Sequence, residues 1–154
     1  MPGRADQPTL LVVEDDPGHA RLLERNLHRL HLPYDLLFLR DGQTVLDYVA
    51  PAQEAGRVRP FPPCLVLLDL NLPGRSGIEV LATLKSDPQT RHIPVIVFTT
   101  TDDPHEIARC YALGCNAYVT KPIAYDQFIA VLQKLSGLLT VITLPPGASQ
   151  VAVT

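Results

Sequence analysis

The stretch Cys64-Leu65-Val66-Leu67-Leu68-Asp69 decides the fold, because five apolar residues in a row end in a single carboxylate. Three further runs of this form are Leu10-Leu11-Val12-Val13 before Glu14-Asp15-Asp16, Val95-Ile96-Val97-Phe98 before Thr99, and Ala117-Tyr118-Val119-Thr120 before Lys121. Short apolar runs are typical of strands buried in a parallel sheet, and such a sheet binds its ligands just outside the carboxyl ends of its strands. The sequence therefore predicts that an acidic cluster, one further aspartate, a hydroxyl and an ammonium meet at one edge.

Segments with the period of an α-helix separate these runs, which is typical of a doubly wound α/β fold. After the run that begins at Leu10, Pro17 can open a helix, and its apolar residues Ala20, Leu23, Leu27 and Leu30 form one stripe. The other expected elements are a strand over 34–39, a short helix over 43–49, a helix with Ile78, Leu81 and Leu84 on one face, a helix capped by Asp102 or Asp103 and ended by Gly114, and a last helix with Phe128, Val131, Leu132 and Leu135 on one face. The proline-rich stretch 51–63 is predicted to be a connection.

Length and composition fit one globular domain. The chain has 154 residues, of which 46% are hydrophobic and 19% charged. A net charge of −3 argues against a nucleic-acid partner held by phosphate contacts. Three cysteines without CxxC spacing argue against a disulfide framework or a zinc site. Because no signal-peptide stretch follows Met1 and no apolar run approaches the ~18 residues of a membrane span, we expect a cytoplasmic protein without membrane association.

The predicted edge has the chemistry of phosphoryl transfer. An aspartate carboxylate such as Asp69 can accept a phosphoryl group directly. Because an acidic cluster repels a phosphoryl donor, we expect a Mg²⁺ ion held by the carboxylates of Glu14, Asp15 and Asp69. Lys121 would place a compact positive charge near the phosphoryl oxygens, and Thr99 would add a hydrogen bond.

Each of these residues, taken alone, has an ordinary structural explanation. Glu14 and Asp15 could belong to a loop or a helix cap, and Asp69 could be a turn residue. Thr99 could be a strand-end hydroxyl, and a lone Lys121 would normally be a solvated charge. It is the convergence of four strand ends, in chain order, that favours the site.

The four motifs resemble the receiver domain of two-component response regulators. The matching elements are Leu-Val-Val-Glu14-Asp15-Asp16, Leu-Leu-Asp69-Leu-Asn-Leu-Pro-Gly, Val-Phe-Thr99-Thr100 and Tyr118-Val-Thr-Lys121-Pro122, within a likeness that runs from about Thr9 to Leu135. The resemblance implies a flavodoxin-like, five-stranded parallel sheet in the order 2-1-3-4-5, flanked by five helices and followed by a C-terminal extension. We accordingly expect a receiver domain over 9–136 and an extension over 137–154.

The resemblance also implies roles for individual residues. Asp69 would accept a phosphoryl group from a histidine kinase, so the protein would be a phosphoacceptor that catalyses only its own phosphorylation and dephosphorylation. Asp15, Asp69 and the backbone carbonyl of Asn71 would bind Mg²⁺, with Glu14 acting through a water molecule. In the switch, the Thr99 hydroxyl would move toward the phosphoryl group while the Tyr118 ring turns inward. The family likeness further implies a cis peptide bond between Lys121 and Pro122.

Features outside the site are similar to one subgroup, the small stand-alone regulators partnered with phytochrome-type photoreceptor kinases. These features are the long connection 51–63, the sequence Lys85-Ser86-Asp87-Pro88, and the tail Leu139-Thr-Val-Ile-Thr-Leu-Pro-Pro146. The apolar segment 138–144 has two interpretations: it packs on its own domain, or it joins the face of the fourth helix, fifth strand and fifth helix in a homodimer. The likeness to the subgroup favours the homodimer.

Other functions remain open from the residues. A phosphatase of the haloacid dehalogenase type also uses a strand-end aspartate and Mg²⁺, but needs an acid two positions later, where Asn71 stands. A flavodoxin-like nucleotide or flavin binder would need a phosphate loop where Glu14-Asp15-Asp16 would repel the phosphate. A chemotaxis-type or phosphorelay receiver, served by a kinase without a light sensor, differs from the favoured interpretation only in its partner.

Overall fold

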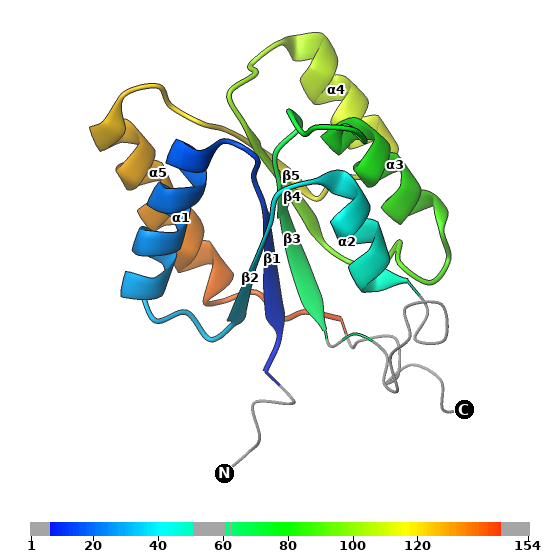
Figure 1. Cartoon of the computed structure of the whole chain (residues 1–154), viewed down its shortest axis with the longest axis horizontal. Coiled ribbons are helices and arrows are strands. Elements are labelled where there is room, and N and C mark those ends of the chain that lie inside the picture. The colour runs from blue at the N-terminus through cyan, green and yellow to red at the C-terminus, as the bar shows by residue number, and fades with distance from the viewer. Residues whose placement is uncertain (1–6, 51–60, 62, 146–154) are drawn as a thin grey trace.

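A computed structural model describes residues 7–50, 61 and 63–145 (Figure 1). Strands and helices alternate along the described chain as β1 (Thr9–Val13), α1 (Pro17–Arg29), β2 (Asp35–Leu39), α2 (Gly42–Val49), β3 (Cys64–Leu68), α3 (Gly77–Ser86), β4 (Val95–Thr99), α4 (Pro104–Leu113), β5 (Ala117–Thr120) and α5 (Tyr125–Leu139). Most of the predicted connection 51–63 lies outside the described residues. No helix in the part of the chain that the structure describes is long and apolar enough to cross a membrane.

The strands form one parallel sheet in the order β2-β1-β3-β4-β5, which confirms the predicted fold class. The register brings the carboxyl ends together, because Val13 pairs with both Leu39 and Leu68. Leu68 in turn pairs with Val97, and Thr99 pairs with Thr120. The residues that follow these strands therefore emerge at one edge.

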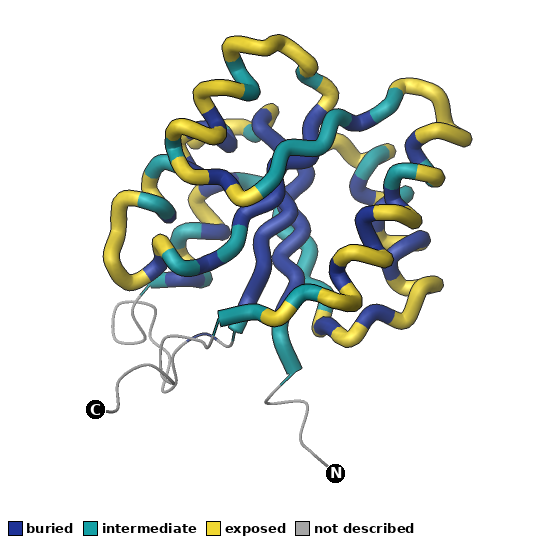
Figure 2. Tube along the Cα trace, turned by 180° about the vertical axis from the view of Figure 1, so that it is seen from behind, coloured by how far each residue is buried: buried dark blue, intermediate teal, exposed yellow. Residues whose placement is uncertain are grey.

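Helices cover both faces of the sheet, with α1 and α5 on one side and α2, α3 and α4 on the other (Figure 1). All five residues of β1, β3 and β4 are consequently buried, as the dark blue centre of Figure 2 shows. Side chains that point to either face of these strands meet a helix, so both alternate positions must be apolar. This double burial explains why these strands appear in the sequence as continuous apolar runs.

Aspartate or serine side chains cap α1, α2, α3 and α4, and the cap of α4 lies at one of the two predicted positions. Asp103, rather than Asp102, caps α4, and its carboxylate accepts a 3.0 Å hydrogen bond from the backbone N–H of His105. Gly114 ends α4 with φ of +108°, a left-handed conformation that glycine adopts without steric cost. The predicted start and end of this helix are thus confirmed.

Two details of the predicted helices are wrong. Leu30 does not belong to the buried stripe of α1; it is 39% exposed, because the helix ends at Arg29 and Leu30 is its C-cap. The last helix does not stop near Gly137 but continues to Leu139, whose side chain is buried. A glycine inside a helix costs only about 1 kcal/mol relative to alanine, and burial of a leucine offsets that cost.

The apolar segment 138–144, which comprises the last two residues of α5 and the five that follow, divides between the interior and the solvent. Leu139 is buried, and its carbonyl accepts a 2.9 Å hydrogen bond from the Tyr34 hydroxyl, while Ile142 and Leu144 pack against the core formed by α1, α5 and the sheet. Leu138 and Val141 are 48% and 75% exposed. Packing on its own domain, one of the two interpretations of this segment, therefore accounts for three of its five apolar residues.

Gly77, the first residue of α3, gives a test of how closely this helix approaches the end of β3. A Cβ atom at position 77 would lie 2.3 Å from the carbonyl oxygen of Asp69 and 2.5 Å from the Cα atom of Leu70, both of them backbone atoms. We expect Gly77→Ala to lower the free energy of unfolding by about 2 kcal/mol or more, as overpacking does, measured by urea denaturation.

Gly137 is the matched control for this test. It is exposed within α5, and a Cβ atom there would meet nothing within 4 Å. Gly137→Ala should raise the free energy of unfolding by about 0.5–1 kcal/mol, because alanine favours the helix. Equal effects of the two substitutions would show that the approach of α3 to Asp69 imposes no constraint.

Candidate functional site

Backbone hydrogen bonds extend the sheet by one residue beyond the strands and so place the site residues. The N–H of Glu14 donates to the Leu39 carbonyl at 2.9 Å, and that of Asp69 donates to the Val13 carbonyl at 3.0 Å. The N–H of Lys121 donates to the Thr99 carbonyl at 2.7 Å. The side chains at these positions therefore start from fixed backbone atoms at the edge of the sheet.

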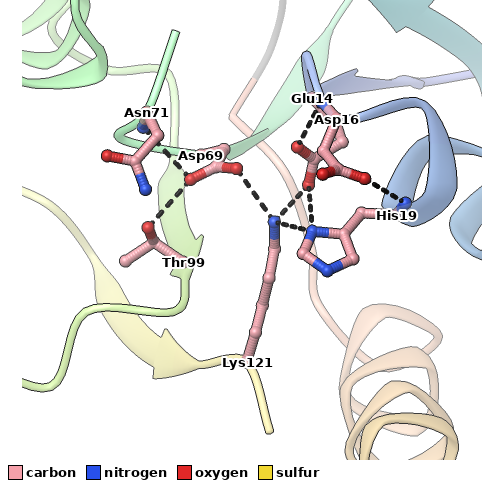
Figure 3. Close-up of polar contacts among 7 residues, drawn as sticks. All are labelled: Glu14, Asp16, His19, Asp69, Asn71, Thr99 and Lys121. Carbon is pink, nitrogen blue, oxygen red and sulfur yellow. Dashed lines mark hydrogen bonds and ion pairs between the residues drawn. The ribbon is translucent and has the colours of Figure 1, made fainter. Parts of the chain in front are cut away.

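The ammonium of Lys121 lies between two carboxylates (Figure 3). Its Nζ donates to Oδ2 of Asp69 at 2.9 Å and forms a short ion pair with Oε1 of Glu14. The side chains are 1% exposed for Lys121, 2% for Glu14 and 7% for Asp69. Two carboxylates facing one ammonium leave an excess of negative charge in a nearly dry site, which favours the binding of a further cation or a proton.

Both oxygens of the Asp69 carboxylate are engaged. Oδ1 accepts hydrogen bonds from the Thr99 hydroxyl at 2.8 Å and from the backbone N–H of Asn71 at 3.2 Å. Burial tends to raise the pKa of Asp69, but its interactions with Glu14, Lys121 and Thr99 together outweigh burial and hold the pKa below its ordinary value. Asp69 is therefore ionised at neutral pH and can act as a nucleophile.

The pKa of Glu14 shifts in the opposite direction to that of Asp69. Burial, reinforced by the interaction with Asp69, raises the pKa of Glu14 to about 7 despite the neighbouring charge of Lys121. The cause is that one ammonium cannot fully compensate two buried carboxylates, so of the two carboxyl groups Glu14 is the one that keeps its proton to the higher pH.

The donors expected for Mg²⁺ are only partly assembled. Glu14 and Asp69 face the same space, whereas Asp15 is exposed and makes no hydrogen bond or ion pair with another described residue. Within the described ranges, no three His, Cys, Asp or Glu side chains form a ready-made metal cluster. The donor set is nevertheless all oxygen with an excess of negative charge, which fits a hard divalent cation.

The two predicted switch residues lie on neighbouring strands, Thr99 at the end of β4 and Tyr118 within β5. Thr99 is fully buried on Asp69, while the Tyr118 hydroxyl donates to the Thr101 carbonyl at 2.7 Å. Burial raises the pKa of Tyr118 to about 12, so the phenol is neutral and remains a donor. The backbone N–H of Tyr118 donates to the hydroxyl of Tyr111 at 3.1 Å. Tyr118 is thereby connected to the loop before α4 and to the last turn of α4.

The expected cis peptide bond between Lys121 and Pro122 is wrong for this structure, because the described chain contains no cis peptide bond. An X–Pro bond still favours trans by about 0.5–1 kcal/mol, and the trans form already allows Lys121 to reach both carboxylates.

His19 is the site residue that sequence reasoning missed. Its Nδ1 lies 3.3 Å from Nζ of Lys121 and 3.8 Å from Oε1 of Glu14. The signal was present, because position 19 precedes Leu23 by four residues and therefore extends the buried stripe of α1 toward the site. The prediction counted only apolar residues in the buried stripe of α1, and it therefore did not include His19.

The geometry can now be compared with known proteins. Residues 10–133 match the response regulator receiver domain. The chain belongs to the response regulator receiver family. The match includes all four strand ends that carry the site.

Several relatives of this receiver have been characterised structurally. Response regulator Rcp1 of Synechocystis sp. is 35% identical over 138 residues, which are 88% of this chain and 92% of Rcp1. The Mn(2+)-bound form of Rcp1 has a TM-score of 0.78 at 34% identity and covers 89% of this chain and 98% of its own. A receiver domain from Rhodospirillum rubrum has a TM-score of 0.82 at 42% identity, and the alignment covers 90% of this chain and 98% of that domain. The phosphorylated cyanobacterial phytochrome response regulator RcpA has a TM-score of 0.78 at 33% identity, and the alignment covers 89% of this chain and 97% of RcpA. This receiver is therefore similar to phytochrome response regulators.

The raised pKa of Glu14 predicts a pH dependence of stability in metal-free buffer. Because the folded-state pKa lies above the ordinary value of 4.5, the stabilisation by proton binding is complete below pH 4.5 and is lost as the pH rises through about 7. We expect the free energy of unfolding of wild type to fall by roughly 2 kcal/mol relative to Glu14→Gln between pH 5 and pH 8. Urea denaturation in the presence of a chelator measures the difference.

Glu24→Gln is the control, because Glu24 is exposed on α1 and lies outside the site. Its stability should follow that of wild type at each pH. Parallel curves for wild type and Glu14→Gln would contradict the prediction, since they would mean that the two proteins bind the same number of protons on folding.

Proposed function

We propose that this receiver accepts a phosphoryl group from a sensor histidine kinase on Asp69. The observation that supports this most strongly is the state of the Asp69 carboxylate at the end of the central strand. It is buried and ionised, and it is held by Lys121, Thr99 and the backbone of Asn71. The protein then acts as a phosphoacceptor in a two-component pathway and changes the state of other proteins rather than turning over a substrate.

In the proposed transfer, an oxygen of Asp69 forms a bond to the phosphorus atom while the P–N bond of the phosphohistidine donor breaks. The electron pair of that bond stays with the imidazole, which leaves as a neutral ring after it takes up a proton. The chain's own contribution is electrostatic: the Lys121 ammonium is already positioned 2.9 Å from Asp69, where negative charge accumulates on the phosphoryl oxygens. The Thr99 hydroxyl at 2.8 Å can then turn from Asp69 to the phosphoryl group.

We propose that Asp15, Asp69 and the backbone carbonyl of Asn71 hold Mg²⁺, with Glu14 acting through water. The relative Rcp1 is known in a Mn(2+)-bound form, which supports the binding of a divalent cation by this receiver. Bound there, the cation would neutralise the excess negative charge of the cluster and polarise the phosphoryl oxygens. Asp15 is exposed and free to turn toward it.

Signal output is proposed to pass through Thr99 and Tyr118. Movement of the Thr99 hydroxyl toward a phosphoryl group would leave space at the end of β4, next to the loop whose Thr101 carbonyl holds the Tyr118 hydroxyl. Loss of that 2.7 Å bond would let the ring turn inward and change the surface formed by α4 and β5. Partners that bind this surface would then distinguish the two states.

The proposed kinase is of the phytochrome type. The support comes from the relatives, because RcpA is a phytochrome response regulator and is 33% identical to this chain over an alignment that covers 89% of this chain. A kinase without a light sensor, as in chemotaxis-type regulators, is the second candidate. The cytoplasmic location, the absence of a nucleic-acid partner and the stand-alone organisation stay predictions from the sequence.

We also propose that the receiver is a homodimer. Leu138, in the last turn of α5, and Val141, two residues after that helix, are both exposed, and α5 belongs to the face that the dimer interpretation uses. Exposed apolar side chains that lie close together favour an interface, and a closed twofold arrangement is the commonest one.

Asp69→Asn tests the phosphoryl-transfer proposal. The amide is not a nucleophile, so labelling by radioactive acetyl phosphate in the presence of Mg²⁺ should be lost. Asp35→Asn is the control, because Asp35 pairs with Thr9 at the opposite end of the sheet and its substitution should leave labelling unchanged. Labelling of Asp69→Asn at the wild-type level would falsify the assignment of Asp69.

Leu138→Lys combined with Val141→Lys tests the dimer. Both side chains are exposed in the single chain, so the substitutions should leave its stability nearly unchanged while placing four like charges in the proposed interface. Sedimentation equilibrium at tens of micromolar should show a dimer for wild type and a monomer for the double variant. Leu139 is unsuitable for this purpose because it is buried in its own domain. A monomeric wild type, phosphorylated or not, would exclude the dimer.

A further inference from the structure

The buried ammonium of Lys121 has three hydrogens and three acceptors, and the third acceptor is His19. Nδ1 of His19 is 3.3 Å from Nζ of Lys121, within hydrogen-bonding distance, whereas it is 3.8 Å from Oε1 of Glu14. The closer contact is therefore the one to the lysine, with Nδ1 accepting and Nε2 carrying the ring proton. Without this contact, one N–H of an almost fully buried ammonium would have no partner among the side chains of the site, which is costly.

The start of α1 directs the histidine inward. Asp16 caps this helix by accepting a 2.9 Å hydrogen bond from the backbone N–H of His19. In a capping box, the side chain at the position of His19 would bond back to the N–H of the capping residue. Here the backbone N–H of the capping residue Asp16 donates instead to Oε2 of Glu14, at 3.1 Å. The imidazole is thereby released from capping and available to the site.

An aromatic wall holds the imidazole ring in place. The ring of His19 stacks on Phe128 of α5 with centroids 5.7 Å apart and an interplanar angle of 22°. Phe128 also contacts Phe98, the residue before Thr99, at a centroid distance of 5.7 Å. Nζ of Lys121 lies 5.6 Å from the centroid of Phe98. The acceptor and the ammonium are thus held against the same pair of rings.

We propose that His19 is a positioning residue for Lys121, one that keeps the ammonium in place while the two carboxylates change partners. This inference rests on the proposed function, in which Asp69 becomes an acyl phosphate and Glu14 turns to the cation. Both acceptors are then engaged elsewhere, and the uncharged imidazole is the acceptor that stays with Lys121. An ammonium fixed in advance at the place where negative charge develops contributes more than one that must be reoriented.

His19→Leu keeps an apolar side chain on Phe128 but removes the acceptor. We expect it to slow Mg²⁺-dependent labelling by acetyl phosphate roughly tenfold, as misplacement of a catalytic group by a fraction of an ångström does. His19→Asn should recover most of the loss, because its side-chain oxygen takes the place of Nδ1. His19→Gln, which carries its oxygen one bond further out, should not. The control is His28→Leu, the same change at an exposed position of α1 where the ring faces Phe38.

A double-mutant cycle separates positioning from general damage to the fold. In a Lys121→Met background the ammonium is absent, so adding His19→Leu should change the labelling rate less than twofold. Three results would each overturn the inference. The first is labelling of His19→Leu at the wild-type rate, and the second is a tenfold slowing by His19→Leu in the Lys121→Met background as well. The third is equal labelling rates for His19→Asn and His19→Leu. If His19→Leu does not fold, His19→Asn and His19→Gln decide the question between them.

A measurement without a phosphodonor distinguishes failure of this inference from failure of the proposed function. The ¹⁵N chemical shifts of the His19 ring in the full chain should show Nδ1 as the acceptor, and they should change on Lys121→Met but not on His28→Leu. Wild-type protein that cannot be labelled, yet shows this contact, would reject the proposed function and keep the placement of His19. Labelled wild-type protein without the contact would reject the role of His19.

Discussion

The structure of the site depends on a single buried ammonium that faces two buried carboxylates. Transferring charged groups from water into a protein is expensive unless each is paired and hydrogen-bonded. Lys121 meets this condition only because Glu14 and Asp69 start from neighbouring strand ends, whose own N–H groups are bonded to the last residues of adjacent strands. The parallel sheet therefore fixes the three charges before any side chain adjusts. Its two helical layers supply the burial that makes their interaction strong.

The imbalance of this cluster gives it a function. One ammonium cannot satisfy two carboxylates, so Asp69 is held ionised while the pKa of Glu14 rises to about 7. A site in this state favours added positive charge and presents an ionised oxygen nucleophile. The same arrangement would be a poor structural salt bridge, since a single hydrophobic replacement could be at least as stable. The conflict between local stability and charge is typical of functional sites.

Most of this arrangement could be predicted from the sequence, because strands buried on both faces must be apolar at every position. The runs before Glu14, Asp69, Thr99 and Lys121 therefore identify both the strands and the edge where they end. Details that depend on a helix end could not be predicted in this way. The burial of Leu139, and with it the continuation of α5 through Gly137, depends on a contact with Tyr34 more than a hundred residues earlier. His19 was missed for a related reason, since its role depends on Phe128 and Lys121 rather than on its neighbours in α1.

Helix α5 connects the two regions that the sequence could not fully resolve. Phe128 in its first turns stacks on the ring of His19, and Leu139 at its end is bonded to Tyr34 at the opposite end of the sheet. The eleven residue steps from Phe128 to Leu139 span about 16 Å along a helix, which moves as a stiff unit over such a distance. Leu138 is exposed in the last turn of this helix, and Val141 is exposed two residues beyond it. A change in the packing of His19 on Phe128 would therefore be transmitted through one continuous element to the apolar surface proposed for dimerisation. Because the buried Leu139 fixes the end of the helix to its own domain, such a change would appear there as a shift of the whole helix rather than as release of the segment.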